Sequence, residues 1–365
     1  MRKIIAVFAA VIAAACCLMS CASRDSRIPE QDGKIQVVTS IFPIYDWVRN
    51  ILGDQTETFD VHLLLDNGTD LHSFQPAAED IMRISTCDLL IYVGGESDQW
   101  VSGALKEAMN KDMVVVDLMD VLGNSIKEEE IIEGMQDDHD HEPQNQEDPD
   151  HEPQSREDPD HETQTREDPD HETQAREASG RAASAEGYDE HVWLSLRNAS
   201  ILSEHISEVI RTLDPDNSDI YKNNTAAYLE KLGALDAEYQ AAADQAEFST
   251  LLFGDRFPFR YLTDDYGLKY YAAFSGCSAE AEASFETITF LSQKMDELSL
   301  PAVMTIEGTD HRLAETIIQN TQSGDQEILT LNSMQSATAK DIQNGMTYLG
   351  IMEENLAVLK KALQK

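Results

Sequence analysis

Short apolar runs alternate with amphipathic segments through the first part of the chain. Four runs have the length and apolar content of buried strands: residues 34–40, 58–65, 88–94 and 113–118. Three segments between them carry apolar side chains at helical spacing: residues 43–52, 76–86 and 97–110, the last with Ser97 as its expected N-cap. Continuous apolar strands that alternate with helices are typical of a parallel sheet covered on both faces. The pattern therefore predicts an α/β lobe.

The same alternation returns near the end of the chain. Strands are expected at residues 250–254, 268–274, 302–307 and 327–331, and helices at residues 286–298, 312–321 and 339–363. Between the two halves, Pro215 begins a helix that continues to about residue 246 and would be about 45 Å long at about 1.5 Å per residue. That length exceeds what one small domain needs. We therefore predict two α/β lobes, residues 34–213 and 247–365, joined by one long rigid helix, residues 214–246.

A low-complexity insert interrupts the first lobe at residues 128–187. It contains a ten-residue repeat at residues 147–156, 157–166 and 167–176, with too few apolar side chains to bury a core, so we expect a disordered loop. Residues 128–177 hold 21 acidic side chains against three Arg. Imidazole and carboxylate are zinc-type ligands, so the insert is interpreted as a metal-collecting arm; the alternative is an acidic loop that only solvates. Its histidines are His139, His141, His151, His161 and His171.

The N-terminus has the features of an export signal. Residues 1–20 combine two basic residues, a short apolar run and a small residue before Cys21. The ending Leu18-Met19-Ser20-Cys21 resembles the bacterial lipobox, which implies cleavage before Cys21 and lipid on its sulfur; simple cleavage nearby is the alternative. Residues 21–33 are then a lipid-anchored tether. We expect an exported lipoprotein on the extracellular or periplasmic face of the cell membrane.

Two cysteines remain in the mature chain if Cys21 is acylated. In an exported protein Cys87 and Cys277 could form one disulfide, or they could be buried thiols in separate lobes.

Two histidines follow apolar segments in similar settings. His72 lies in a turn after the strand predicted at residues 58–65, and His191 lies in the segment Asp189-Glu190-His191-Val192-Trp193-Leu194. A single histidine at a strand end is more often a satisfied polar residue than a ligand, but two of them could form half of a metal site. The formal net charge of −41 argues against a nucleic-acid partner and fits the capture of cations.

Four segments together resemble a known family: Thr39-Ser40-Ile41-Phe42-Pro43, the run Gly68-Thr69-Asp70-Leu71-His72-Ser73-Phe74-Gln75-Pro76, Tyr92-Val93-Gly94-Gly95, and Asp189–Leu194. The chain is similar to the zinc and manganese substrate-binding lipoproteins of bacterial ABC importers. This resemblance implies a monomeric receptor with a metal site in the cleft between its lobes. The receptor would capture zinc and deliver it to an ABC permease and its ATPase. It also implies that His72 and His191 are metal ligands and that the His-rich insert marks the zinc type, since manganese-type members generally lack it.

The third ligand is where the chain departs from the family pattern. The family has a His or Glu three residues before the Phe of a Phe-x-Tyr motif, and Phe259-Arg260-Tyr261 places Arg256 there. Arg stays protonated and cannot bind a metal, so the neighbouring Asp255 is the expected substitute. Glu307, at the end of the strand predicted at residues 302–307, is the expected fourth ligand, with water as an alternative.

Other functions are weighed against zinc capture. The same fold could bind manganese, because two imidazoles and a carboxylate suit both ions. The chain could also be an adhesin-like surface lipoprotein with a structural metal. An enzyme is not expected, because the sequence has no His-Glu-x-x-His motif, no Gly-x-Ser-x-Gly motif and no phosphate-binding glycine loop.

Overall fold

The computed structural model describes residues 33–55, 57–136, 187–278 and 282–364. The predicted signal segment, the lipidation site at Cys21 and the five histidines of the insert lie outside these residues, so those predictions stay open. Residues Ile35–Lys365 make one compact unit. Within the described residues, no helix combines the length and the apolar character that crossing a membrane requires.

The first sheet has four parallel strands in the order β2-β1-β3-β4. Their bounds are β1 Ile35–Thr39, β2 Phe59–Leu63, β3 Leu89–Tyr92 and β4 Val114–Asp117. The connecting helices are α2 Phe42–Leu52, α3 Ala78–Thr86, α4 Trp100–Lys106 and α5 Leu118–Leu122. Most residues of these strands are apolar, which fits a sheet covered by helices on both faces, as predicted. We call this sheet and its helices the N-terminal lobe.

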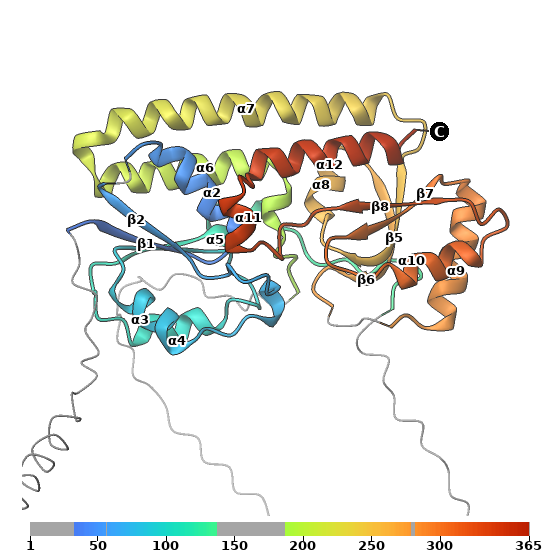
Figure 1. Ribbon diagram of the computed structural model, residues 1–365, viewed down its shortest axis with the longest axis horizontal. Helices are drawn as coiled ribbons and strands as arrows, with labels where there is room; N and C mark the ends of the chain where they lie inside the picture. Colours follow the sequence, from blue (N-terminus) through green and yellow to red (C-terminus); the bar gives the residue numbers. More distant parts are fainter. Residues whose placement is uncertain (1–32, 56, 137–186, 279–281, 365) are drawn as a thin grey trace, which may run out of the picture. The chain divides into compact units, whose positions relative to one another are not determined.

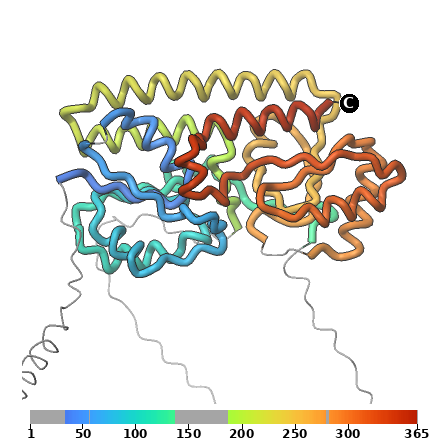
Figure 2. Tube along the Cα trace, in the orientation of Figure 1, coloured from blue at the N-terminus to red at the C-terminus, as the bar shows by residue number. Residues whose placement is uncertain are grey.

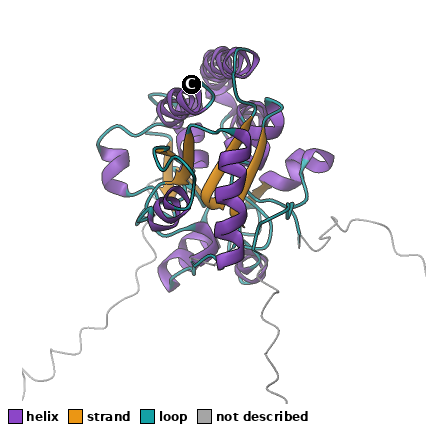
Figure 3. Cartoon of the chain, turned by 90° about the vertical axis from the view of Figure 1, so that its right-hand side faces the viewer, coloured by secondary structure: helices purple, strands orange, loops and turns teal. Residues whose placement is uncertain are grey.

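The second sheet repeats this topology in the order β6-β5-β7-β8, again with all strands parallel. Its strands are β5 Thr250–Phe257, β6 Lys269–Ser275, β7 Ala302–Ile306 and β8 Glu327–Leu331, and its helices are α8 Arg260–Asp265, α9 Phe285–Leu298 and α10 Arg312–Gln319. Figure 3 shows helices on both sides of these strands. We call this part the C-terminal lobe. Its presence confirms the prediction of two parallel-sheet lobes.

One long helix, α7, runs from Ser218 to Asp244 after a single 3-10 turn at Pro215–Asn217. It packs on α6, which spans Leu196–Leu213, and on α2 of the N-terminal lobe. Figure 1 shows α7 running from beside these helices to the start of the C-terminal lobe. Tyr221, Tyr228 and Tyr239 are buried along its inner face, so the helix is held by packing along its length. The predicted long linking helix is confirmed.

The final helix predicted at residues 339–363 is wrong as a single element. The structure has α11 at Ala339–Gln343 and α12 at Tyr348–Ala362, with Gly345 between them at a φ of 96°. A positive φ ends a helix, and the Thr347 hydroxyl, which accepts from the backbone N–H of Gly350, begins the next one. Apolar periodicity continues across the break, which is why the sequence pattern predicts one helix.

The segment before α12 returns to the N-terminal lobe, where the red part of the trace lies beside the blue part (Figure 2). The backbone N–H of Ala339 donates to the carbonyl of Asp66 at 2.6 Å. The backbone N–H of Tyr348 donates to the Asp46 carboxylate at 3.1 Å. The lobes are therefore connected by this C-terminal segment as well as by α7.

Part of the segment predicted to be disordered has a defined path. The backbone N–H of Glu129 donates to the Gly187 carbonyl at 2.8 Å, which brings the two ends of the insert together. The backbone N–H of Gln136 donates to the carbonyl of Ala273 on β6 at 2.9 Å. Residues 128–136 thus reach from the N-terminal lobe to the C-terminal sheet.

Candidate metal centre

His72 lies in a single 3-10 turn, Leu71–Ser73, beyond the carboxyl end of β2. The Asp70 side chain caps this turn and accepts from the backbone N–H of His72 at 3.0 Å. The other oxygen of Asp70 pairs with Arg256 of β5 at 2.8 Å, which links the two lobes beside the histidine. Nδ1 of His72 hydrogen-bonds the Ser97 hydroxyl at 2.7 Å. These contacts hold the imidazole ring in one orientation.

The contact with His72 also explains a wrong detail of the predicted secondary structure. Ser97 is expected to cap the helix of residues 97–110, but α4 begins only at Trp100 and ends at Lys106. The Ser97 hydroxyl is used by the histidine instead.

His191 is fully buried and directly precedes the 3-10 turn Val192–Leu194. One carboxylate oxygen of Asp189 accepts both from its backbone N–H at 2.8 Å and from its Nδ1 at 2.9 Å. The backbone carbonyl of Asp189 accepts from the hydroxyl of Tyr261 at 2.9 Å, so α8 of the C-terminal lobe supports the same loop. A neutral imidazole whose Nδ1–H donates to a carboxylate has an unprotonated Nε2 that can bind a metal.

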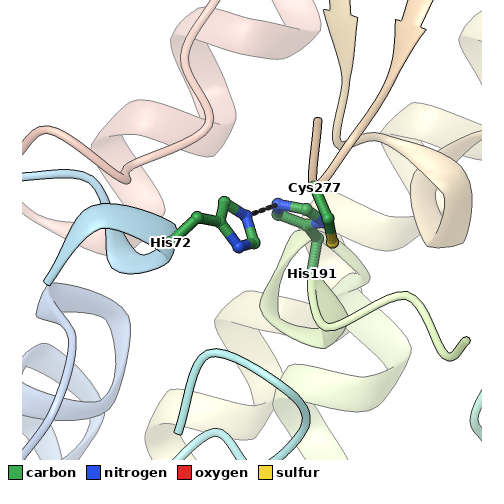
Figure 4. A group of neighbouring side chains, drawn as sticks. All are labelled: His72, His191 and Cys277. Atoms are coloured by element: carbon green, nitrogen blue, oxygen red, sulfur yellow. Dashed lines mark hydrogen bonds between the residues drawn. The ribbon is translucent and has the colours of Figure 1, made fainter. Parts of the chain in front are cut away.

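The imidazole rings of His72 and His191 face each other directly. Nε2 of His72 and Nε2 of His191 are 3.2 Å apart, and Figure 4 shows these nitrogens pointing toward one another. The Nδ1 atoms point away, toward Ser97 and Asp189 respectively. A single cation could therefore bind both Nε2 atoms while the outer partners keep the rings in place.

The surroundings favour neutral imidazole at His72. Burial, together with the charge of His191, lowers the pKa of His72 to about 3. Burial alone would lower the pKa of His191 as well, but the charge and hydrogen bond of Asp189 outweigh it and raise that pKa. At most one of the two rings is therefore positively charged near neutral pH, and a metal ion would need to displace only that one additional proton.

Glu190 adds negative charge beside the two rings. Its side chain is only 1% exposed, and its Oε1 accepts from the backbone N–H of Ser97 at 2.7 Å. Its Oε2 lies 3.7 Å from Nδ1 of His72 and has no hydrogen-bond partner among the described residues. Gly95 makes room for this carboxylate, because a Cβ there would lie 2.4 Å from Oε1. A buried carboxylate oxygen without a donor is costly unless a cation compensates it.

Cys277 is the third metal-ligating side chain at this place. One ligand atom each from His72, His191 and Cys277 lies within 4.8 Å of the others, and Figure 4 shows the thiol beside the ring of His191. Cys277 follows the carboxyl end of β6, so it comes from the C-terminal lobe. In the described part of the chain Cys87 and Cys277 are both free thiols, which decides against a disulfide between them.

From the sequence, Cys277 is expected only as half of a disulfide or as a buried thiol. A usable signal was present, since Gly276-Cys277 comes shortly after the strand predicted at residues 268–274 and ligand-binding groups gather at the carboxyl ends of strands. The role of Ser97 had no such signal, because its contact with His72 joins segments that are separate along the chain. Asp189, by contrast, contacts His191 from two residues earlier in the same motif.

Asp255 and Glu307 are not part of this group. Asp255 is buried in β5, where Oδ2 accepts from the backbone N–H of Ile306 at 3.1 Å and from the Thr309 hydroxyl at 3.0 Å. Glu307 accepts from the backbone N–H of Ser333 at 2.7 Å and from its hydroxyl at 2.8 Å. Both carboxylates thus accept hydrogen bonds from residues at or just beyond the ends of neighbouring strands. Their role as metal ligands stays a prediction.

Comparison with known proteins decides the family. The profile described as "Zinc-uptake complex component A periplasmic" matches residues 37–362, nearly all of the described chain. The chain belongs to this zinc-uptake component A family. The resemblance drawn from the sequence motifs is thereby confirmed. The family is one of uptake-complex components and is not an enzyme class.

Individual relatives have low sequence identity to this chain. The "Zinc-binding lipoprotein AdcA" of Streptococcus pneumoniae is 28% identical over 352 residues, which are 96% of this chain and 60% of that protein. The chain therefore spans about three fifths of the length of this streptococcal relative. The "High-affinity zinc uptake system protein ZnuA" of Bacillus subtilis is 27% identical over 356 residues, 97% of this chain and 96% of that one.

Solved structures share the fold. The Zn(II)-bound ZnuA-like domain of Streptococcus pneumoniae AdcA has a TM-score of 0.63 at 26% identity, over 91% of this chain and 99% of that domain. The metal-dependent lipoprotein YcdH of Bacillus subtilis has a TM-score of 0.65 at 24% identity, over 90% of this chain and 99% of that one. Both support the arrangement of two α/β lobes in this zinc-uptake component.

Proposed function

We propose that this zinc-uptake component is an extracytoplasmic receptor that captures zinc and delivers it to an ABC importer. The observation that carries the proposal is the pair of Nε2 atoms of His72 and His191, 3.2 Å apart. Two ligands on a tetrahedral ion with bonds of about 2.0–2.1 Å lie about 3.3 Å apart, so the two rings are already spaced for one zinc ion. Family membership and the zinc-binding names of the relatives support the same metal.

The role is binding and release without catalysis. The ligands gather where both lobes contribute, so relative motion of the lobes would open and close the site. The ion pair of Arg256 with Asp70 and the contact of Tyr261 with Asp189 join the lobes next to the histidines. Closing around the ion would therefore strengthen contacts that already exist.

Zinc is favoured over manganese by the chemistry of the pair. Imidazole nitrogen suits zinc, whereas manganese is bound mainly by carboxylate, carbonyl and water oxygens. The two carboxylates predicted as further ligands have their oxygens engaged by backbone and hydroxyl groups. A nitrogen-rich site with few free oxygens therefore supports the zinc receptor over the manganese receptor.

Export and partners rest on the sequence and the family. We propose that Cys21 carries the lipid that anchors the receptor to the cell membrane, and that a permease with its ATPase receives the metal. The His-rich insert, with His139, His141, His151, His161 and His171, would raise the local zinc concentration near the cleft. Uptake measured at scarce zinc after deletion of residues 137–176 tests that role, since unchanged uptake would contradict it.

The zinc site is tested by competition titration of the mature chain against a chromophoric chelator, with zinc and with manganese. We expect one tight zinc site that survives deletion of residues 137–176 and weakens by at least about 100-fold in His72→Ala and in His191→Ala. His205→Ala, on α6, is the matched control and should bind as the unchanged chain does. Tight binding that persists in both ligand variants, or tighter manganese binding in the cleft, would overturn the proposal.

A further inference from the structure

The proposed zinc site has two nitrogen ligands from one lobe and needs at least one ligand from the other. Cys277 is the side chain of the C-terminal lobe that the structure brings into the group, with ligand atoms within 4.8 Å of one another. It is held there by its loop: its backbone N–H donates to the Glu129 carboxylate at 3.2 Å. Gly276 lets this loop approach, because a Cβ at that position would lie 2.9 Å from Cε1 of His191.

The distances suit a mixed nitrogen and sulfur site. Zinc–sulfur bonds are about 2.3 Å and zinc–nitrogen bonds about 2.0–2.1 Å, so a sulfur ligand lies roughly 3.6 Å from each nitrogen in a tetrahedral site. The ligand atoms of the present group lie within 4.8 Å of one another, so each distance exceeds that value by about 1.2 Å at most, and a change of the cysteine rotamer moves its sulfur by more than this.

A second observation, on the outer side of the His72 ring, also favours a cation nearby. Glu190 is buried, and its Oε2 lacks a hydrogen-bond partner among the described residues while lying 3.7 Å from Nδ1 of His72. Asp189, also buried, is committed to His191. A divalent ion bound to the imidazoles would lie close to these two buried carboxyl groups and interact favourably with them.

We propose that the Cys277 thiolate is the zinc ligand supplied by the C-terminal lobe, which completes a site of two histidines and one cysteine. This inference rests on the proposed function. On binding, the thiol proton leaves to solvent, a zinc–sulfur bond forms, and the fourth position stays open to water or to a ligand that moves in on closure. A thiolate makes the site selective for thiophilic ions such as zinc and cadmium and disfavours manganese.

The test is cobalt(II) titration of the mature chain followed by absorption spectroscopy. A cobalt–thiolate bond produces an intense ligand-to-metal band in the near ultraviolet that nitrogen and oxygen ligands do not produce. We expect this band in the unchanged chain and in Cys87→Ser, the matched control with a buried thiol in the other lobe, and we expect it to be lost in Cys277→Ser. Zinc affinity should fall by at least about 100-fold in Cys277→Ser, more than the loss of an outer partner costs.

A second measurement avoids any folding defect of the variant. The unchanged chain is alkylated with a maleimide with and without zinc, and the modified peptide is mapped by mass spectrometry. Protection of Cys277 by zinc, with no change at Cys87, supports the proposal.

The outcomes separate this inference from the function on which it rests. Tight zinc binding that depends on His72 and His191, with no cobalt–thiolate band and no protection of Cys277, would overturn the cysteine ligand and leave the receptor standing. Zinc binding that is unaffected by His72→Ala and His191→Ala would overturn both.

Discussion

Asp189→Asn tests whether the carboxylate that accepts hydrogen bonds from His191 controls metal affinity. In the structure one oxygen of Asp189 holds both the backbone N–H and Nδ1 of His191, at 2.8 and 2.9 Å. Asparagine keeps an oxygen of the same size but loses the charge that makes His191 a better ligand. Outer partners of this kind contribute about 10–100-fold to metal affinity, which is about 1.4–2.7 kcal/mol. We expect zinc affinity to fall within that range.

The assay is competition with a chromophoric chelator at constant pH and salt, with thermal unfolding measured in parallel. The exposed Asp325, in the loop before β8, provides the matched control Asp325→Asn, which should change neither quantity. Because Asp189 is expected to act through the imidazole, Asp189→Asn should cost little more in a chain that already carries His191→Ala. Zinc affinity within about twofold of the unchanged chain, or fully additive losses in the double variant, would refute this reasoning.

Three further changes probe the rest of the fold and the site. Burial raises the pKa of Asp46 from 3.8 to about 6, so the folded chain holds this proton more tightly than the unfolded one. The stabilising effect of this proton is fully present below about pH 4 and is lost as the pH rises through 6. Asp46→Asn should therefore remove a decline of about 2 kcal/mol in the free energy of unfolding, measured with urea between about pH 4 and pH 7. Gly276→Ala places a Cβ 2.9 Å from both the Phe257 carbonyl and Cε1 of His191, so we expect about 1–3 kcal/mol of destabilisation by the same urea method, together with weaker zinc binding in the chelator assay. Asp255→Asn should lower stability by about 1–3 kcal/mol and leave zinc affinity within about threefold, because its oxygens bind Ile306 and Thr309.

Each of these expectations has an outcome that contradicts it. The same pH dependence in Asp46→Asn as in the unchanged chain would show that another group controls that range. Undiminished zinc affinity in Gly276→Ala would show that the ring of His191 is not constrained by the loop. A loss of zinc affinity of about 100-fold in Asp255→Asn, with stability preserved, would establish Asp255 as a ligand.

The sequence by itself determined the architecture. Strands that are buried on both faces must be almost continuously apolar, and their alternation with helices is visible without any tertiary information. The long linking helix was predictable for the same reason, because Pro215 marks its start and apolar residues recur at helical spacing along it. His72 and His191 could be found because each stands in a motif that follows a strand or opens a turn.

Tertiary structure alone decided which side chain of the C-terminal lobe lies beside the two imidazoles. Asp255, Glu307 and Cys277 all come from the carboxyl-end region of the second sheet, so the strand-end rule cannot rank them. The structure distinguishes them by their neighbours: backbone N–H and hydroxyl donors bind the two carboxylates, whereas the thiol lies beside the imidazoles. Hydrogen bonds between segments that are distant along the chain make this choice, and no local pattern in the sequence records them.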